Sequence, residues 1–149
     1  MANFTGKSIL ICGVGGQGTL LMSKTLTAGL VQAGFDVKMS EVHGMAQRGG
    51  SVSTQVRYGE KVYSPISGRG EADVLVAFEK LEGARYSNLL KIGGTALIND
   101  YEVMPLPVSS GAATYPAILF DEMQKVFDLR VIPASAIAKS LGNIRCTNI

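Results

Sequence analysis

Hydrophobic and polar residues in the first part of the chain follow the order strand, glycine turn, helix, strand. Ser8–Cys12 is an apolar run that ends in glycines, which is typical of a buried parallel strand. Apolar residues then recur at helical spacing until Gly34, a natural helix stop. Phe35–Glu41 predicts a second strand. Together these elements predict a βαβ unit. The apolar helix positions are Met22, Leu26, Leu30 and Ala33.

From Ser51 onward the pattern changes to strict alternation. Every second residue of Ser51–Tyr58 shares one face of the predicted strand. Gly59-Glu60 then fits a two-residue turn, and Lys61–Pro65 is predicted to return as its partner strand. The sequence therefore predicts an antiparallel hairpin added to the sheet.

The rest of the chain alternates strands and helices, with an irregular stretch rich in proline before the last helices. The fold class expected is α/β: a Rossmann-like, mostly parallel sheet with helices on both faces and the added hairpin. The length of 149 residues fits a single domain spanning 1–149. The later predicted elements are strand Asp73–Glu79, a helix to about Lys91, strand Thr95–Asn99, irregular Met104–Pro116, helix Ala117–Phe127, strand Leu129–Pro133 and helix Ala134–Leu141.

Composition excludes several classes of protein. Hydrophobic residues make up 46% and charged residues 17%, with a net charge of +2 and no basic run, so no nucleic-acid partner is expected. No apolar run approaches the roughly 18 residues that a membrane span needs, and no signal peptide opens the chain. A cytoplasmic protein without a membrane partner is expected.

The two cysteines, Cys12 and Cys146, stand alone. An iron–sulfur cluster usually needs four thiolates and a structural zinc about four Cys or His ligands, so this chain is expected to hold neither by itself. Cys12 lies in an apolar run and is expected to be a small buried hydrophobe.

The turn Gly13-x-Gly15-x-x-Gly18 matches the dinucleotide fingerprint in its proper context, after a strand and before a helix. Exposed amides at such a helix start attract anions. Gly16 and Gln17 fill the variable positions, and Glu41 lies where an acid would bind a ribose. Two interpretations stay open: a nucleotide or coenzyme site, or a strand-to-helix turn that binds nothing.

The loop after the second strand carries His43, the single histidine, then Gln47 and Arg48 with Gly49-Gly50. A guanidinium beside glycines suits a phosphate or carboxylate, although a salt bridge that pins the loop is an equal alternative. Arg69, between two glycines, repeats this chemistry and is expected to converge on the same side of the sheet. His43 is expected to be structural or interfacial. No catalytic triad or carboxylate pair stands out, so the residues alone predict an anion-binding α/β module that needs a partner.

Several stretches resemble the gamma-type domain of the 2-oxoacid:ferredoxin oxidoreductases, most closely the small (beta) subunit of the indolepyruvate branch. The resemblance covers nearly the whole chain, and EVHGMAQRGGSV is the stretch that points to this branch. These stretches are ILICGVGGQGTLLMSKTL, SEVHGMAQRGGSVSTQVRYG, VYSPISGRGEADVLVAFEKLEGAR, GGTALIND and LGNIRCTN.

The resemblance implies a subunit without catalytic residues of its own. The enzyme would decarboxylate an aryl 2-oxoacid oxidatively with coenzyme A, giving acyl-CoA, carbon dioxide and reduced ferredoxin. Thiamine diphosphate, Mg²⁺ and [4Fe–4S] clusters are expected on a large partner subunit, and the isolated chain is expected to fall back on a homodimer. Gly13–Gly18 and Arg48–Gly50 would face coenzyme A or the large subunit, with His43, Gln47 and Arg69 at the interface. Relatives continue past the final GN segment, so the sequence predicts a domain shortened at Ile149. An independent NAD(P)- or CoA-binding protein is the alternative.

Overall fold

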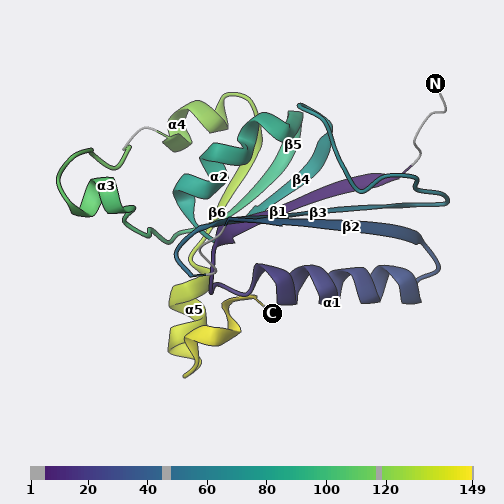
Figure 1. Cartoon of the computed structure of the whole chain (residues 1–149), viewed down its shortest axis with the longest axis horizontal. Coiled ribbons are helices and arrows are strands. Elements are labelled where there is room, and N and C mark those ends of the chain that lie inside the picture. Colours follow the sequence, from purple (N-terminus) through teal and green to yellow (C-terminus); the bar gives the residue numbers. More distant parts are fainter. Residues whose placement is uncertain (1–5, 45–47, 117–118, 149) are drawn as a thin grey trace.

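The computed structural model describes residues 6–44, 48–116 and 119–148. Its centre is a six-stranded mixed sheet of order β2-β3-β1-β4-β5-β6 (Figure 1). β3 is antiparallel to both of its neighbours, whereas β1, β4, β5 and β6 pair in parallel. The strands are β1 Lys7–Val14, β2 Asp36–His43, β3 Ser51–Gly59, β4 Ala72–Ala77, β5 Leu90–Asn99 and β6 Asp128–Ile132.

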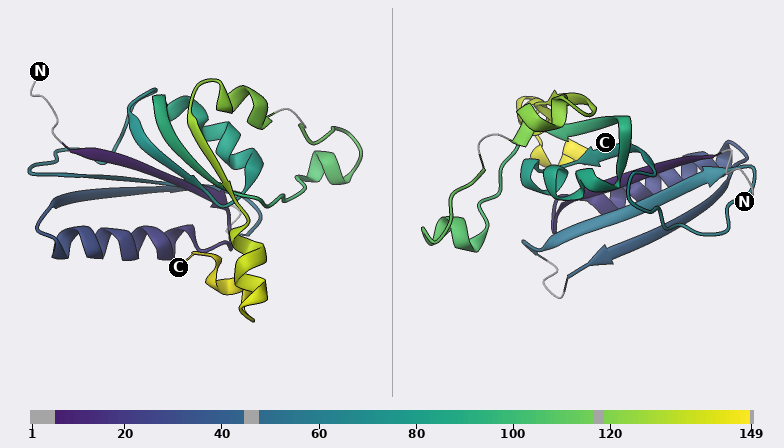
Figure 2. Two further views of the ribbon diagram at one scale, coloured as in Figure 1. Left: turned by 180° about the vertical axis from the view of Figure 1, so that it is seen from behind. Right: turned by 90° about the horizontal axis from the view of Figure 1, so that it is seen from above.

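Helices cover both faces of the sheet, as predicted. The long helix α1 lies along one face, and α2 and α4 lie on the other (Figures 1 and 2). α5 follows β6 at the same end of the sheet as the start of α1. The helices are α1 Thr19–Gln32, α2 Lys80–Tyr86, α3 Leu106–Ser109, α4 Leu119–Gln124 and α5 Ala134–Ser140, with 3₁₀ turns η1 Ser87–Leu89 and η2 Ile144–Asn148.

Each face of the sheet has its own hydrophobic core, because successive residues of β1 point to opposite sides. Leu10 and Cys12 pack with Leu75 and Ile98 under α2 and α4. Ile11 packs with Val56 beneath α1. The prediction for Cys12 is confirmed, since its exposed fraction is 0%.

The predicted hairpin partner is wrong. Residues 61–65 form no strand, and β3 instead follows β2 as the second arm of a β2–β3 hairpin. The amide of Val62 donates to the Asp36 carboxylate at 2.9 Å rather than to a strand. β3 has β2 on one side and β1 on the other, so both of its edges are already paired when the chain leaves it.

Smaller differences lie after β4. The predicted helix to Lys91 ends earlier, because α2 stops at Tyr86 and β5 begins at Leu90. The stretch 104–116 is irregular except for the single turn of α3. The strand and helix predicted near the end match β6 and α5. Of the helix predicted over 117–127, the described part is α4, and residues 117–118 lie outside the described ranges. Among the described helices none is long and apolar enough to cross a membrane.

The parallel strands give the sheet two distinct edges. At the carboxyl edge, where β1, β4 and β5 end, lie the glycine turn 13–18, the β2–β3 loop and a projecting arm, residues 100–116, that carries α3 (Figure 1). At the amino edge, where these strands begin, lies the connection 60–71 between β3 and β4.

Candidate functional site at the carboxyl edge

The glycine turn and the β2–β3 loop are joined by backbone hydrogen bonds. The Gly15 amide donates to the Gly50 carbonyl at 2.8 Å, and the Gly49 amide donates to the Gly15 carbonyl at 3.2 Å. Gly49 has a φ of 77°, a conformation that favours glycine. The structure therefore brings together two predicted segments, Gly15–Gly18 and Arg48–Gly50.

Gln17 holds the turn from inside. Its Oε1 accepts from the Val14 amide at 2.7 Å, and its Nε2 donates to the Phe78 carbonyl at 3.3 Å, across the gap between β1 and β4. A Cβ on Gly13 would lie 2.7 Å from Gln17 Oε1, which explains the glycine at that position. Both ends of the Gln17 amide thus bond the protein itself, and the expected cofactor-binding role of Gln17 stays a prediction.

The end of the chain covers the other side of the turn. The Asn148 Nδ2 donates to the Gly18 carbonyl at 3.2 Å, and a Cβ on Gly18 would come within 2.2 Å of this nitrogen. Helices leave β1 and β4 on opposite faces, so this is the topological switch point where open α/β sheets commonly bind ligands. A pocket of about 370 Å³ remains there, lined by Gly16, Gln17, Gly18, Phe78, Asn99, Tyr101, Ser135, Ile144, Arg145, Thr147 and Asn148.

A second pocket, of about 430 Å³, opens on the α1 side of the turn. Glu41 and His43 both reach it, since residues two apart on β2 share a face. Helix α1 has no side-chain cap at Gly18 and no acid in its first turn, so its amides suit an anion. In a dinucleotide-binding sheet β1 and β2 are neighbours. Here β3 lies between them, so Glu41 on β2 is one strand further from the glycine turn. The remaining lining residues are Gly15, Gly16, Gly18, Thr19, Leu20 and Val52.

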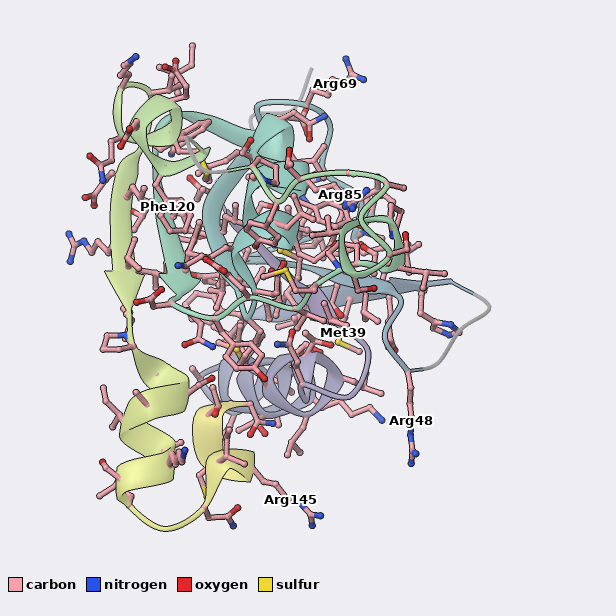
Figure 3. All side chains as sticks on the ribbon, turned by 90° about the vertical axis from the view of Figure 1, so that its left-hand side faces the viewer. Met39, Arg48, Arg69, Arg85, Phe120 and Arg145 are labelled. Carbon is pink, nitrogen blue, oxygen red and sulfur yellow. The ribbon has the colours of Figure 1, made fainter. Side chains whose placement is uncertain are left out.

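The predicted basic residues are separated. Arg48 is exposed beside the glycine turn, whereas Arg69 lies in the amino-edge connection, and the two point away from each other (Figure 3). The prediction that they converge is wrong, because β3 carries the chain to the opposite edge before Arg69. His43 is exposed, with Nδ1 3.2 Å from the Gly44 carbonyl oxygen. Gln47 lies outside the described residues.

Two buried carboxylates at this edge, Glu79 and Glu82, were not predicted from the sequence. Glu79, 1% exposed, caps α2 by accepting from the Glu82 amide at 2.8 Å. Its other oxygen accepts from the Tyr115 hydroxyl at 2.7 Å and the Val103 amide at 3.2 Å. Burial, followed by the bond to Glu79, raises the pKa of the Tyr115 phenol above its usual value. An acid directly after a buried strand, at the start of a helix, is the signal that could have revealed Glu79.

Glu82, 5% exposed, connects α2 to the β2–β3 loop. Its carboxylate accepts from the Ser51 hydroxyl and, at 3.1 Å, from Arg85 Nε. Ser51 follows Gly49 and Gly50, so this carboxylate fixes the loop segment that bonds Gly15. Burial and then the charges of Glu82 and Glu79 raise the pKa of the Cys12 thiol well above its usual value. Cys12 is therefore kept as a neutral, unreactive thiol.

Within the described ranges, no three or more His, Cys, Asp or Glu side chains are grouped to hold a metal ion. The described site consists of backbone amides, two buried carboxylates and exposed guanidinium groups around two pockets.

Comparison with known proteins identifies the family. The sequence profile described as Pyruvate ferredoxin/flavodoxin oxidoreductase matches residues 8–149. The chain belongs to this family.

Relatives within the pyruvate ferredoxin/flavodoxin oxidoreductase family carry the name indolepyruvate oxidoreductase subunit IorB. The protein of Thermococcus kodakarensis is 43% identical over 148 residues, which cover 95% of this chain and 72% of the relative. That of Pyrococcus horikoshii is 39% identical with the same coverage. The resemblance to the indolepyruvate branch is confirmed.

Solved structures of the same enzyme class share the fold. The 2-oxoglutarate:ferredoxin oxidoreductase of Magnetococcus marinus, with 2-oxoglutarate, coenzyme A and succinyl-CoA bound, aligns with a TM-score of 0.75 at 21% identity. This alignment covers 98% of the present chain but only 23% of that longer one. The gamma subunit of a keto/oxoacid ferredoxin oxidoreductase from Geobacter sulfurreducens aligns with a TM-score of 0.64 at 21% identity, over 95% of this chain and 70% of that one. The predicted α/β fold class is confirmed.

Proposed function

We propose that this chain is the small subunit of an indolepyruvate oxidoreductase. The complete enzyme would decarboxylate an aryl 2-oxoacid oxidatively, transfer the acyl group to coenzyme A and pass the electrons to ferredoxin. The observation that carries the proposal is the 43% identity to the Thermococcus kodakarensis subunit along 95% of the chain.

In this proposal the chain binds coenzyme A and the large subunit and supplies no catalytic residue. Thiamine diphosphate, Mg²⁺ and [4Fe–4S] clusters belong to the large subunit, where they supply carbanion and electron-transfer chemistry. On this chain, Glu79 and Glu82 are buried and already bonded to the chain's own amides and hydroxyls. The arrangement supports a shaped protein surface at the carboxyl edge rather than a self-contained active site.

Coenzyme A is the ligand proposed for this edge. The amides at the start of α1, which have no side-chain cap, border the pocket of about 430 Å³ and suit its phosphates. The exposed Arg48 lies next to Gly49 and Gly50, which bond Gly15 of the same turn, and its guanidinium also suits a phosphate. Calorimetric titration of coenzyme A into the assembled enzyme tests this role. Arg48→Glu should weaken binding, and Arg69→Glu, an exposed arginine at the amino edge, is the matched control. If the two variants bind coenzyme A with equal affinity, Arg48 does not bind coenzyme A, and the carboxyl edge keeps only its proposed role in binding the partner.

The subunit proposal itself is tested by reconstitution. The chain is co-expressed anaerobically with the large subunit of its own organism, purified through a tag on this chain, and assayed for indolepyruvate- and CoA-dependent reduction of ferredoxin. A brown, thiamine-containing complex with this activity is expected. A colourless chain that purifies alone would contradict the proposal.

The second candidate is an independent NAD(P)-binding protein, which the position of Glu41 beside the glycine-turn pocket favours. Micromolar NAD binding by the isolated chain, lost in Glu41→Ala, would support it. The subunit proposal predicts no binding.

A further inference from the structure

The arm at residues 100–116 extends away from the sheet and its covering helices (Figure 2). Its only regular element is the single turn of α3, which in the described structure has no extensive packing with any other helix or strand. From Val103 to Phe120 the sequence contains no Asp, Glu, Lys, Arg or His. The arm is therefore uncharged from Val103 to its end, and its charged residues, Asp100 and Glu102, lie at its start.

Apolar side chains are exposed on this arm. Leu106 is 79% exposed and Met104 is 49% exposed. Pro105 and Pro107 flank Leu106 and restrict the backbone around it. Exposed apolar groups held on a stiff projection favour insertion into another protein.

The base of the arm is fixed by two adjacent residues of the sheet body. Glu79 accepts hydrogen bonds from Val103, near the start of the arm, and from Tyr115, near its end. Lys80 pairs with Asp100 at 2.6 Å and Glu102 at 3.0 Å. A loop held at both ends by a buried carboxylate presents Leu106 in a defined place, which reduces the entropy lost on binding.

The arm is too small to be an interface alone. A stable interface takes roughly 20–30 residues from each partner. The surface that can complete it lies at the same edge, beside the glycine turn, where the exposed Arg145 (Figure 3) lines the pocket of about 370 Å³. The exposed carboxylates of Asp100 and Glu102 at this edge already pair with Lys80, so a second copy docked about a twofold axis would offer Arg145 mainly carboxylates that are engaged elsewhere. The edge therefore fits a different protein, with an apolar cleft and an acidic rim.

We propose that Leu106 and the uncharged segment 103–116 of the arm insert into an apolar cleft of the large subunit, next to acidic residues that meet Arg145. This inference rests on the proposed function, since it takes the large subunit as the partner. Beyond that function, it names the segment of this chain that docks and the apolar and acidic character of the large-subunit surface that binds it.

The test measures the dissociation constant between the purified full chain and the thiamine-bearing large subunit, by interferometry under anaerobic conditions. Leu106→Asp should raise it at least tenfold. The matched control is Ile92→Asp, because Ile92 is 88% exposed but lies at the amino edge; a change below twofold is expected. Leu106 begins α3, where an acid is tolerated, so unchanged circular dichroism and urea midpoint should show that both variants fold.

Other outcomes would overturn the inference. If Leu106→Asp binds the large subunit within twofold of the wild type, the arm does not dock there. If it abolishes only self-association of the isolated chain, measured by light scattering, the arm binds a second copy instead. If the wild-type chain itself does not bind the large subunit, the proposed function is contradicted. The wild-type measurement therefore distinguishes this failure from a failure of the arm inference alone.

Discussion

The two edges of the sheet hold their loops with different chemistry. At the amino edge, Asp73 bonds the Ser8 amide at 2.8 Å and pairs with Lys91 at 2.5 Å and Lys7 at 3.4 Å. Asp36 similarly pairs with Lys38 and, at 3.8 Å, with Lys61. These lysines are substantially exposed, so the pairs are solvated.

At the carboxyl edge, carboxylates that are almost fully buried bind backbone amides and hydroxyls. Glu79 holds the arm, and Glu82 holds the β2–β3 loop through Ser51. Buried hydrogen bonds are costly to lose, whereas exposed ion pairs contribute little. The most deeply buried carboxylates of the two edges therefore lie under the edge that we assign to coenzyme A and the partner.

Removing Glu79 should have the largest effect on stability. Glu79→Ala deletes the cap of α2 and leaves the Val103 amide and Tyr115 hydroxyl without their acceptor. We expect a loss of about 3 kcal/mol in the free energy of unfolding, measured by urea denaturation. Glu79→Gln, which keeps an acceptor oxygen, should lose less. A loss below about 0.5 kcal/mol in Glu79→Ala would erase the contrast between the edges.

Ser51→Ala should have the next largest effect. It removes a partly buried hydrogen bond to the Glu82 carboxylate and frees the start of β3. The expected loss is about 2 kcal/mol, since bonds to charged groups are worth more than neutral ones. Amide hydrogen exchange at Gly15 and Gly50 should also accelerate. Ser53→Ala, at a buried serine of the same strand, is the control, and equal acceleration there would refute a specific role for Glu82.

Tyr115→Phe should cost about 1 kcal/mol, the usual contribution of one hydrogen bond. It also gives a pH test. The folded pKa of Tyr115 is raised above the unfolded value, so its contribution is complete below pH about 10 and is lost as the pH rises further. The difference between the absorbance titrations of wild type and Tyr115→Phe should have its midpoint above the ordinary tyrosine value. A midpoint near 10 would contradict the bond to Glu79.

Asp73→Asn, at the amino edge, should have the smallest effect, below about 1 kcal/mol at neutral pH. Partial burial acts to raise the pKa of Asp73, but the bonds from Lys91 and the Ser8 amide outweigh it, and the pKa is lowered. Its contribution is therefore present above pH about 4 and is lost as the pH falls through the folded value. Urea midpoints of wild type and variant should converge in acid. A loss comparable to that of Glu79→Ala would remove the contrast.

Local patterns were sufficient to predict most elements. The glycine turn, the alternation of Ser51–Tyr58 and the apolar run of β4 each have a physical signature within a few residues. The pairing of β3 was not predictable in this way, because strand order depends on partners far along the chain. Arg69 was misplaced for the same reason: its edge of the sheet follows from the direction of β3.

The sequence predicted which backbone segments meet at the candidate site, but not which side chains hold them in place. The turn and Arg48–Gly50 meet as expected, since glycine-rich segments at strand ends share an edge. Gln17, Glu79 and Glu82 have roles that depend on burial and on the atoms facing them. A glutamate in FEKLEGARY looks like part of a solvated helix until the fold buries it.

Hydrogen exchange of the full chain, alone and bound to its large subunit, tests the central claim most directly. We predict slower exchange in the complex at 48–51 and 101–115, the carboxyl-edge loop and arm, with no change at 60–71 in the amino-edge connection. Protection at 60–71 without protection at the carboxyl edge would contradict the claim that this edge is the functional surface.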